Sequence, residues 1–386
     1  MERIYLDHAA TTPIHPVVMD KVMETLNTTY GNPSSIHSFG REARKQLDDA
    51  RSILAESIGA KPAEIVFTSG GTEADNLAIL GTARAKRAQG KHIITTEIEH
   101  HAVLHTCQSL EKEGFEITYL SPDEYGQISL ESVKEALRPD TILVTIMYGN
   151  NEVGTLQPIK EIAKILRSHQ AIFHTDAVQV FGLKPIDVTE LGVDLLSVTA
   201  HKINGPKGIG FLYIKADTGI APILYGGEQE RKRRAGTENL PAIVGFAKAA
   251  QISMDGLEKK VECFSHLKQT LIQTLESEQI VLNINGTFEE GLPHILNISF
   301  PETDVESMLV NLDLIGIAAS SGSACTAGSV EPSHVLVAMF GESSNRIRNS
   351  IRFSFGLGNT EEEIVQAAKE IAKIVRRFQN RKEDIR

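Results

Sequence analysis

Residues 194–202 read Asp194-Leu-Leu-Ser-Val-Thr-Ala-His-Lys202, and the chain continues as Ile-Asn-Gly-Pro-Lys-Gly-Ile-Gly210. The apolar, β-prone run indicates a buried strand, and the Gly/Pro segment indicates a turn before the next apolar run. Lys202 is therefore predicted at a strand end, where open α/β sheets usually bind ligands. A lysine held there can lose its proton by desolvation and form a Schiff base. The alternative is an ordinary surface lysine. The Schiff-base role is supported only if other segments of the chain supply partners for Lys202.

Predicted strands and helices alternate along much of the chain. Strands are expected at residues 64–68, 92–96, 116–120, 141–147 and 171–175, and helices at 73–87, 101–113 and 159–168. Unbroken apolar strands separated by helices indicate a mostly parallel sheet covered on both faces. A long helical region is expected from 240 to about 276. Strands at 294–300 and 350–355, with helices at 304–312 and 360–378, then indicate a smaller α+β domain. We predict a large domain at residues 14–259 and a small one at 1–13 and 260–386.

Composition limits the function classes. The chain has 386 residues, 41% hydrophobic and 23% charged, which is ordinary for a globular protein. Its net charge of −11 argues against broad nucleic-acid or anionic-membrane binding. No apolar run approaches the ~20 residues that span a bilayer, and the start lacks a signal or transit pattern. Three widely spaced cysteines form neither a disulfide framework nor a metal cluster. We expect a cytoplasmic protein without a metal site.

The junction Phe67-Thr-Ser-Gly-Gly-Thr-Glu73 could bind one phosphate. Gly70 and Gly71 let the backbone approach a ligand, the N–H groups of the helix start bind anions, and Thr72 adds a hydroxyl. The junction is not a Walker motif and lacks the Gly-x-Gly-x-x-Gly fingerprint, which favours a single phosphate over a pyrophosphate. A plain turn with a helix cap is the alternative.

Asp176 follows another predicted strand, in His174-Thr-Asp-Ala-Val-Gln179. A carboxylate at a buried strand end needs a cationic or N–H partner. Asp176 could therefore pair with a protonated heterocycle nitrogen, and Gln179 could donate to a ring oxygen. An aspartate that caps the following helix is the alternative.

Three further segments carry candidate ligand-binding side chains. One histidine of Glu99-His-His-Ala102 could stack on a ligand ring and move protons, or could only cap or pack. Asn150 and Asn151 follow a strand and could hold a carboxylate, or could form a turn. Arg352 lies inside an apolar strand, so its charge needs either a substrate carboxylate or a structural ion pair.

The segment Arg231-Lys-Arg-Arg-Ala-Gly-Thr-Glu-Asn239 is a basic run in an acidic protein. Such runs are usually solvated loops. Thr237 could nevertheless reach another phosphate oxygen, and residues 231–234 could belong to a docking face for a partner.

The cysteines differ in their surroundings. Cys107 and Cys263 lie among apolar residues of predicted helices, so both are expected to be structural core residues. Cys325 lies in Ala319-Ser-Ser-Gly-Ser-Ala-Cys-Thr-Ala-Gly-Ser329, which has no large apolar side chain and suits a mobile loop. An exposed thiol in a cysteine-poor protein is a candidate nucleophile.

Together these segments provide a Schiff-base lysine, a carboxylate for a ring nitrogen, a one-phosphate cradle, a stacking histidine and a carboxylate clamp. Those are the parts that a pyridoxal phosphate site requires. With those residues in place, the chain resembles the cysteine desulfurases of the NifS/IscS type, within the fold-type I pyridoxal phosphate enzymes of the class V aminotransferase family. The resemblance runs from Tyr5-Leu-Asp-His-Ala-Ala-Thr-Thr12 to Ser350-Ile-Arg-Phe-Ser354. Its most specific parts are Ser320-Ser-Gly-Ser-Ala-Cys-Thr326 and His201-Lys202. It implies an α/β fold with a mostly parallel, seven-stranded-type sheet.

The resemblance also implies a role for each candidate. Lys202 would form the Schiff base, Asp176 would pair with the pyridine nitrogen, Gln179 would contact the ring hydroxyl, and His100 would stack on the ring. Gly71 would belong to the phosphate cradle, and the phosphate would be held by Thr72, Thr199 and His201, with Thr237 from the other subunit of a homodimer. Asn151 and Arg352 would bind the substrate carboxylate, and Cys325 would accept sulfur. Thr199 departs from the serine of many relatives but keeps the hydroxyl. His101 varies among relatives and inherits no role.

The implied reaction removes sulfur from L-cysteine, giving L-alanine and a persulfide on Cys325. The sulfur would pass to a protein acceptor, either a tRNA-thiolating enzyme or an iron–sulfur scaffold, without direct nucleic-acid or membrane binding. Rival hypotheses are a selenocysteine lyase, a transaminase that would not need Cys325, and a catalytically silent scaffold for sulfur-transfer partners. A nicotinamide-dependent oxidoreductase lacks support because the glycine fingerprint is absent.

Overall fold

The computed structural model describes residues 3–322 and 332–383. A seven-stranded sheet lies at its centre, in the order β2-β8-β7-β6-β5-β3-β4. The strands are β2 (Ile65–Thr68), β3 (His92–Thr96), β4 (Glu116–Leu120), β5 (Thr141–Thr145), β6 (Ile172–Asp176), β7 (Leu195–Thr199) and β8 (Gly210–Ile214). Only β8 runs antiparallel to its neighbours, because the turn after residue 202 returns the chain beside β7. The predicted α/β fold with a mostly parallel sheet is confirmed.

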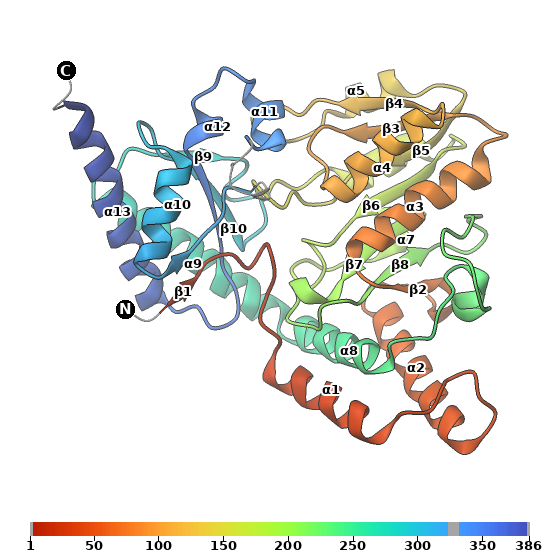
Figure 1. Ribbon diagram of the computed structural model, residues 1–386. Helices are drawn as coiled ribbons and strands as arrows, with labels where there is room; N and C mark the ends of the chain where they lie inside the picture. The colour runs from red at the N-terminus through yellow and green to blue at the C-terminus, as the bar shows by residue number, and fades with distance from the viewer. Residues whose placement is uncertain (1–2, 323–331, 384–386) are drawn as a thin grey trace.

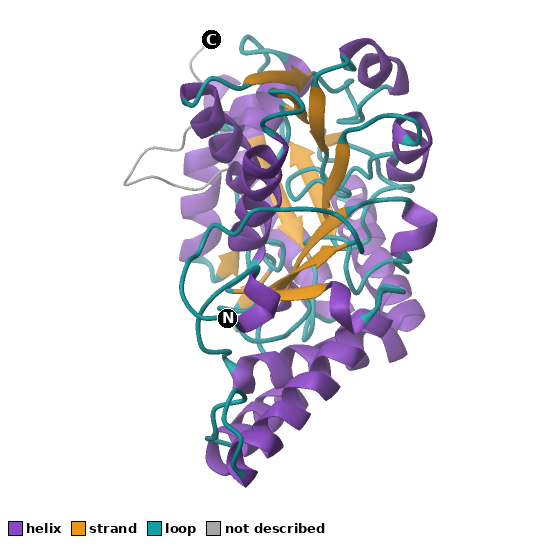
Figure 2. Ribbon diagram, turned by 90° about the vertical axis from the view of Figure 1, so that its right-hand side faces the viewer, coloured by secondary structure: helices purple, strands orange, loops and turns teal. Residues whose placement is uncertain are grey.

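Helices cover both faces of this sheet (Figures 1 and 2). They are α1 (Pro16–Thr28), α2 (Ser38–Glu56), α3 (Gly71–Lys86), α4 (His101–Lys112), α5 (Leu130–Ala136), α6 (Ile159–Leu166), α7 (Val188–Leu191) and α8 (Leu240–Asp255). Adjacent strand residues enter opposite cores: Ile94 packs into the core that contains α2 and α8, and Ile93 packs under α3 and α4. Successive strand side chains point to opposite faces, so a strand covered on both sides is apolar throughout.

A second unit has its own core and its own sheet. Its sheet has the order β12-β10-β9 and is antiparallel, with strands β9 (Asn283–Asn285), β10 (Ile295–Ser299) and β12 (Ser350–Ser354). The N-terminal strand β1 (Ile4–Tyr5) pairs in parallel with β11 (Ile317–Ala318), which places the start of the chain in this unit. Its helices are α9 (Leu257–Ser277), α10 (Val305–Leu314), α11 (His334–Phe340), α12 (Arg346–Asn349) and α13 (Glu361–Glu383).

Three local expectations can be compared with the structure. The helical region predicted from residue 240 is divided at Gly256, where α8 ends and α9 begins. The helix predicted from residue 360 is α13, and a capping box forms at its start, since the Thr360 N–H donates to Glu363 Oε2 (3.1 Å) and the Glu363 N–H to Thr360 Oγ1 (3.2 Å). Cys107 is buried, but the prediction for Cys263 is wrong because its side chain is exposed. The buried residues of α9 begin only at Leu267, which belongs to the core of the second unit.

The described residues contain neither a membrane-spanning helix nor a metal-binding cluster. None of the helices in residues 3–322 and 332–383 is long and apolar enough to cross a membrane. Within the same residues, histidine, cysteine and acidic side chains form no group that could hold a metal ion.

Candidate functional site

A cavity of about 330 Å³ lies where the ends of β5, β6 and β7 face the second unit. It brings together ten of the residues predicted from the sequence. These are Gly71, Thr72, His100, Asn151, Asp176, Gln179, Thr199, His201, Lys202 and Arg352. The carboxyl ends of parallel strands share one sheet edge, which gathers side chains that are distant in sequence.

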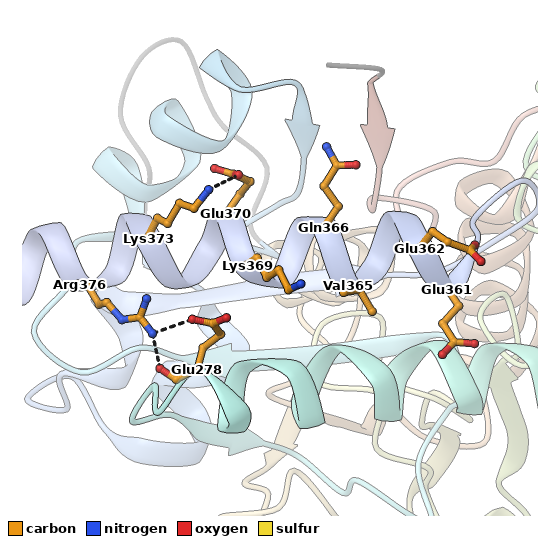
Figure 3. Close-up of a pocket in the computed structure, with 9 residues that line it drawn as sticks. All are labelled: Glu278, Glu361, Glu362, Val365, Gln366, Lys369, Glu370, Lys373 and Arg376. Atoms are coloured by element: carbon orange, nitrogen blue, oxygen red, sulfur yellow. Dashed lines mark hydrogen bonds and ion pairs between the residues drawn. The ribbon is translucent and has the colours of Figure 1, made fainter.

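A larger hollow of about 530 Å³ lies between the end of α9 and one face of α13 (Figure 3). Its walls carry both charge signs, and Arg376 pairs there with Glu278 at 2.8 Å. None of the predicted site residues lines it. We therefore assign the functional site to the cavity at the strand ends.

The start of α3 forms one end of the cavity. Gly70 occupies the N-cap with φ +150° and provides no side-chain hydrogen bond to the first turn, which leaves the N–H groups of that turn free of a side-chain cap. A Cβ on Gly71 would lie 2.9 Å from Val178 Cγ2, so only glycine fits there without movement. Thr72, Thr199 and His201 line the same cavity. Uncapped N–H groups at a helix start, with hydroxyls nearby, fit a phosphate.

Asp176 and His100 flank the middle of the cavity. Asp176 ends β6 and is 6% exposed, and its Oδ1 accepts from the Val178 N–H (2.8 Å). Burial raises the pKa of Asp176 to about 6. His100 caps α4 by accepting from the Ala102 N–H (3.1 Å), and burial, aided by the Lys202 charge, lowers the pKa of His100 to about 4. His100 therefore performs the capping role proposed as its alternative, whereas Asp176 caps no helix, because a turn follows β6 and the next helix is α7. Both residues face the cavity. A neutral His100 can stack on a ring, and Asp176 can pair with a ring cation.

Gln179 is held by two internal hydrogen bonds. Its Nε2 donates to the Ala9 carbonyl (3.0 Å), and its Oε1 lies 3.1 Å from His294 Nε2. An amide nitrogen has two N–H donors, so one remains for a ligand. Sequence reasoning missed His294, because a histidine before an apolar strand gives no signal of what it contacts.

Asp75 is another residue that the sequence did not reveal. It lies on α3, lines the cavity and is 1% exposed, with its Oδ1 3.7 Å from His174 Nε2. Burial and the nearby Asp176 charge raise the pKa of Asp75, whereas burial lowers the pKa of His174 to about 3. Both shifts favour the uncharged form of each side chain over an ion pair. Asp176, with a pKa of about 6, is the acid that can ionise against a ligand cation.

Lys202 ends the short 3₁₀ turn η2 (Ala200–Lys202) that follows β7. Its side chain reaches across to the N-terminal segment, where Nζ donates to the carbonyls of Ala9 and Ala10. Burial, with a smaller contribution from the Arg352 charge, lowers the pKa of Lys202 to about 7. A large fraction of this lysine is then a free amine at neutral pH, which suits a Schiff-base nucleophile.

The lowered pKa of Lys202 gives a testable pH dependence. A carbonyl ligand reacts with the amine and not with the ammonium, so cofactor capture by the apoprotein should accelerate as pH rises through about 7 and then level off. Stopped-flow absorbance of apoprotein mixed with pyridoxal phosphate measures this rate. A midpoint near the ordinary lysine value of 10.5 would contradict the assignment.

Arg352 forms the opposite end of the cavity. It is 3% exposed on β12, and its Nη1 donates to the Asn151 carbonyl (2.9 Å). Its Nη2 pairs with Asp7 Oδ1 at 2.8 Å. Arg352 therefore forms the structural ion pair that is one of its two predicted roles, and it also lines the cavity, as the other role requires. Neighbouring Asn150 is fully buried and organises the turn, since its Oδ1 accepts from the N–H groups of Glu152 (2.8 Å) and Val153 (2.9 Å).

Two predicted residues are not placed in the cavity. Thr237 is exposed and is not among the cavity residues of this single chain. Cys325 lies outside the described residues, but the segment before it reaches the cavity through Ser320 and Gly322. Ser320 and Arg352 exchange two backbone hydrogen bonds of 3.2 and 2.7 Å, which ties the start of the cysteine segment to the strand that carries Arg352.

The basic run at residues 231–234 is partly engaged within the chain. Arg234 forms a two-pronged contact with Glu73 on α3, at 2.7 and 3.0 Å. Arg231 donates to the Ala63 carbonyl (2.6 Å), while Lys232 is exposed. The run therefore fixes its loop against α3 and against the 3₁₀ turn η1 (Pro62–Glu64) that precedes β2. Its role as a docking face stays a prediction.

Comparison with known proteins adds an independent result. The family model for class-V aminotransferases matches residues 4–366. IscS 1 of Bacillus subtilis (strain 168) is 60% identical over 378 residues, covering 98% of this chain and 100% of that protein. The cysteine desulfurase IscS of Dictyoglomus turgidum is 47% identical, with 97% and 95% coverage. Among solved structures, a NifS-like protein has a TM-score of 0.90 at 36% identity, with 97% and 99% coverage. DndA from Streptomyces lividans has a TM-score of 0.77 at 41% identity, with 91% and 99% coverage.

Proposed function

This chain belongs to the class-V aminotransferase family and is a pyridoxal phosphate-dependent cysteine desulfurase, and we propose that the cavity at the strand ends is its active site. The observation that carries the assignment is Lys202, whose buried amine has a pKa lowered to about 7 and shares one cavity with Asp176 and Arg352. Such a combination of a basic amine, an acid and a guanidinium fits an amino-acid substrate bound to a cofactor.

The residues present fit the cofactor at both ends. The uncapped start of α3, with Thr72, Thr199 and His201, would hold the phosphate. Asp176 would keep a proton on the ring nitrogen, Gln179 would donate its remaining N–H to the ring hydroxyl, and His100 would lie against the ring. When bound, pyridoxal phosphate supplies an electron sink that labilises the substrate α-proton.

The chain's own groups then divide the remaining tasks. Arg352 and Asn151 orient the α-carboxylate of L-cysteine, which positions its α-proton for Lys202 Nζ to remove and later return. Cys325, as a thiolate, attacks the substrate sulfur. The carbon–sulfur bond breaks with its electron pair going to Cβ, which gains the proton that Cys325 lost on becoming a thiolate. L-Alanine leaves, and the sulfur stays on Cys325 as a persulfide. Transfer of that sulfur to an acceptor thiolate regenerates Cys325.

Replacing Cys325 with serine tests the reaction class. A serine hydroxyl cannot accept the sulfur as a persulfide, so alanine and persulfide formation from L-cysteine should fall at least about 10²-fold. The cofactor absorption band should stay, because Lys202 is intact. Cys263→Ser is the matched control, since this cysteine is exposed on α9, outside the cavity. Full turnover by Cys325→Ser would instead favour a transaminase or a selenocysteine lyase.

We further propose that the enzyme is a homodimer. Large apolar side chains are exposed on α1, on the start of α2 and on the loop that joins them. They are Val17, Met19, Met23, Leu26, Tyr30, Ile36 and Phe39, and Ile36 is 92% exposed. Seven exposed large apolar side chains within one short stretch of chain favour a protein partner. A second copy seated there would also explain why Thr237, expected to serve the partner's phosphate, is not in the cavity of its own chain.

Sedimentation tests the dimer. Ile36→Asp should shift the holoenzyme from dimer to monomer, because a charge would be buried at the interface. Leu314→Asp on α10 is the matched control, since Leu314 is also highly exposed (78%) but lies in the other unit. A monomeric wild-type enzyme, or a dimer unchanged by Ile36→Asp, would contradict the proposal.

For the sulfur acceptor we propose a protein, either a tRNA-thiolating enzyme or an iron–sulfur scaffold. The net charge of −11 supports a protein acceptor over direct transfer to nucleic acid. Labelled L-cysteine, followed by isolation of the Cys325 persulfide and incubation with each acceptor class, distinguishes the two.

A further inference from the structure

Arg352 is already partly occupied before any substrate binds. Its Nη2 pairs with Asp7 at 2.8 Å and its Nη1 donates to the Asn151 carbonyl at 2.9 Å, while its Nε has no hydrogen-bond partner among the described residues. A guanidinium has five N–H donors. The two internal partners fix its orientation and leave the other donors, including Nε–H, for a carboxylate. Its side chain is 4% exposed, so water contributes little to its solvation.

Asp7 cannot easily move away from this position. Asp7 forms an isolated β-bridge with Ser354 of β12, which lies two residues after Arg352. Its backbone carbonyl accepts from the Ala10 N–H (3.0 Å) and from the Tyr5 hydroxyl (3.1 Å), which closes the turn after β1. The backbone of Asp7 is therefore held in place, and its carboxylate lies against the guanidinium, with 22% of its side chain exposed.

We propose that Asp7 is a positioning residue that orients Arg352 and weakens its hold on α-carboxylates, so that L-alanine can leave after sulfur transfer. The inference rests on the proposed role of Arg352 in binding the substrate carboxylate. A carboxylate that binds Arg352 approaches Asp7, and the two negative charges repel each other across one cation. L-Cysteine and L-alanine carry the same carboxylate, so without the charge of Asp7 the guanidinium would hold both ligands more tightly. Tighter binding of both lowers KM without raising kcat and slows the release of L-alanine.

Asp7→Asn separates charge from shape. The asparagine side chain keeps a carbonyl oxygen for Arg352 Nη2 but removes the repulsion, so the holoenzyme should bind L-alanine about three- to tenfold more tightly. KM for L-cysteine should fall in parallel, without a rise in kcat. Asp7→Ala removes both the charge and the contact that orients Arg352, so it should bind L-alanine more weakly than Asp7→Asn does.

The measurement is the dissociation constant of L-alanine, taken from the change in the cofactor absorption band, which reports binding without turnover. Asp304→Asn is the matched control: it makes the same charge change at the N-cap of α10, outside the cavity, and should leave the constant unchanged. Equal or weaker binding by Asp7→Asn overturns the inference, as does tighter binding by Asp7→Ala than by Asp7→Asn.

Arg352→Gln distinguishes this inference from the proposed function. If this variant loses affinity for L-alanine while Asp7→Asn binds like the wild type, the carboxylate site is correct and only the role of Asp7 is wrong. If Arg352→Gln binds L-alanine like the wild type, the carboxylate site itself is misassigned, and the role of Asp7 falls with it.

Discussion

Replacing Lys202 with alanine is expected to lower alanine formation from L-cysteine at least about 10³-fold, because one residue supplies both a covalent link and a proton-transfer group. The lowered pKa of Lys202 and its contacts with the Ala9 and Ala10 carbonyls indicate an amine prepared for this chemistry. The variant should also lose the absorption band of the protein–cofactor Schiff base. Both effects follow from the removal of a single Nζ.

Lys207→Ala is the matched control for this prediction. Lys207 lies five residues further along the same segment but is exposed and absent from the cavity. Its replacement should leave turnover and spectrum within about twofold of wild type, because exposed substitutions of this kind have small effects. Turnover by Lys202→Ala within tenfold of wild type would contradict the assigned role.

The largest effect on stability is expected at a buried ion pair outside the active site. Arg51 on α2 binds Glu230 through two contacts, Nη2 to Oε1 at 2.6 Å and Nη1 to Oε2 at 2.8 Å. Their side chains are only 10% and 2% exposed. Glu230 also accepts from the Phe67 N–H (3.0 Å) and therefore fastens the loop before Thr237 to the edge strand β2.

Glu230→Ala should lower the free energy of unfolding by about 3–5 kcal/mol, because it leaves the buried Arg51 guanidinium without its carboxylate. Urea unfolding of wild type and variant, both loaded with cofactor, measures the difference. The double change Arg51→Met with Glu230→Leu should recover most of the loss, since an apolar pair carries no unpaired charge. Glu131→Gln is the surface control: Glu131 pairs with Lys134 at 3.0 Å but is 68% exposed, so it should cost at most about 1 kcal/mol.

Much of the architecture followed from local patterns. The apolar runs of β2 to β7 predicted strands because both faces of the sheet are covered, which makes most central positions of these strands apolar. The sequence also placed Lys202, Asp176 and the Gly70-Gly71 junction at strand ends, which is where the cavity formed. Parallel strands bring their carboxyl ends to one edge, so a site made from such ends can be anticipated without knowing the strand order.

Contacts between segments that are distant in sequence could not be anticipated. Asp7 and Arg352 are 345 residues apart and meet because β1 and β12 belong to the same small unit. The pairing of Gln179 with His294, 115 residues away, depends on how that unit packs against the end of β6. The prediction for Cys263 also failed because packing could not be anticipated. Its apolar neighbours on α9 predicted burial, but the folded chain leaves it exposed.

The sequence by itself determined the chemistry at Lys202: a strand followed by a Gly/Pro turn, a lysine at its end, and partners that match one cofactor. The tertiary structure decided how that chemistry is adjusted. It enclosed the amine in the cavity and lowered its pKa to about 7, and it raised the pKa of Asp75 beside Asp176. It also set a carboxylate against Arg352. Local sequence patterns are enough to place a residue at a strand end, a turn or a helix cap. The burial of a side chain and the distance between charges depend on segments that only the folded chain brings together.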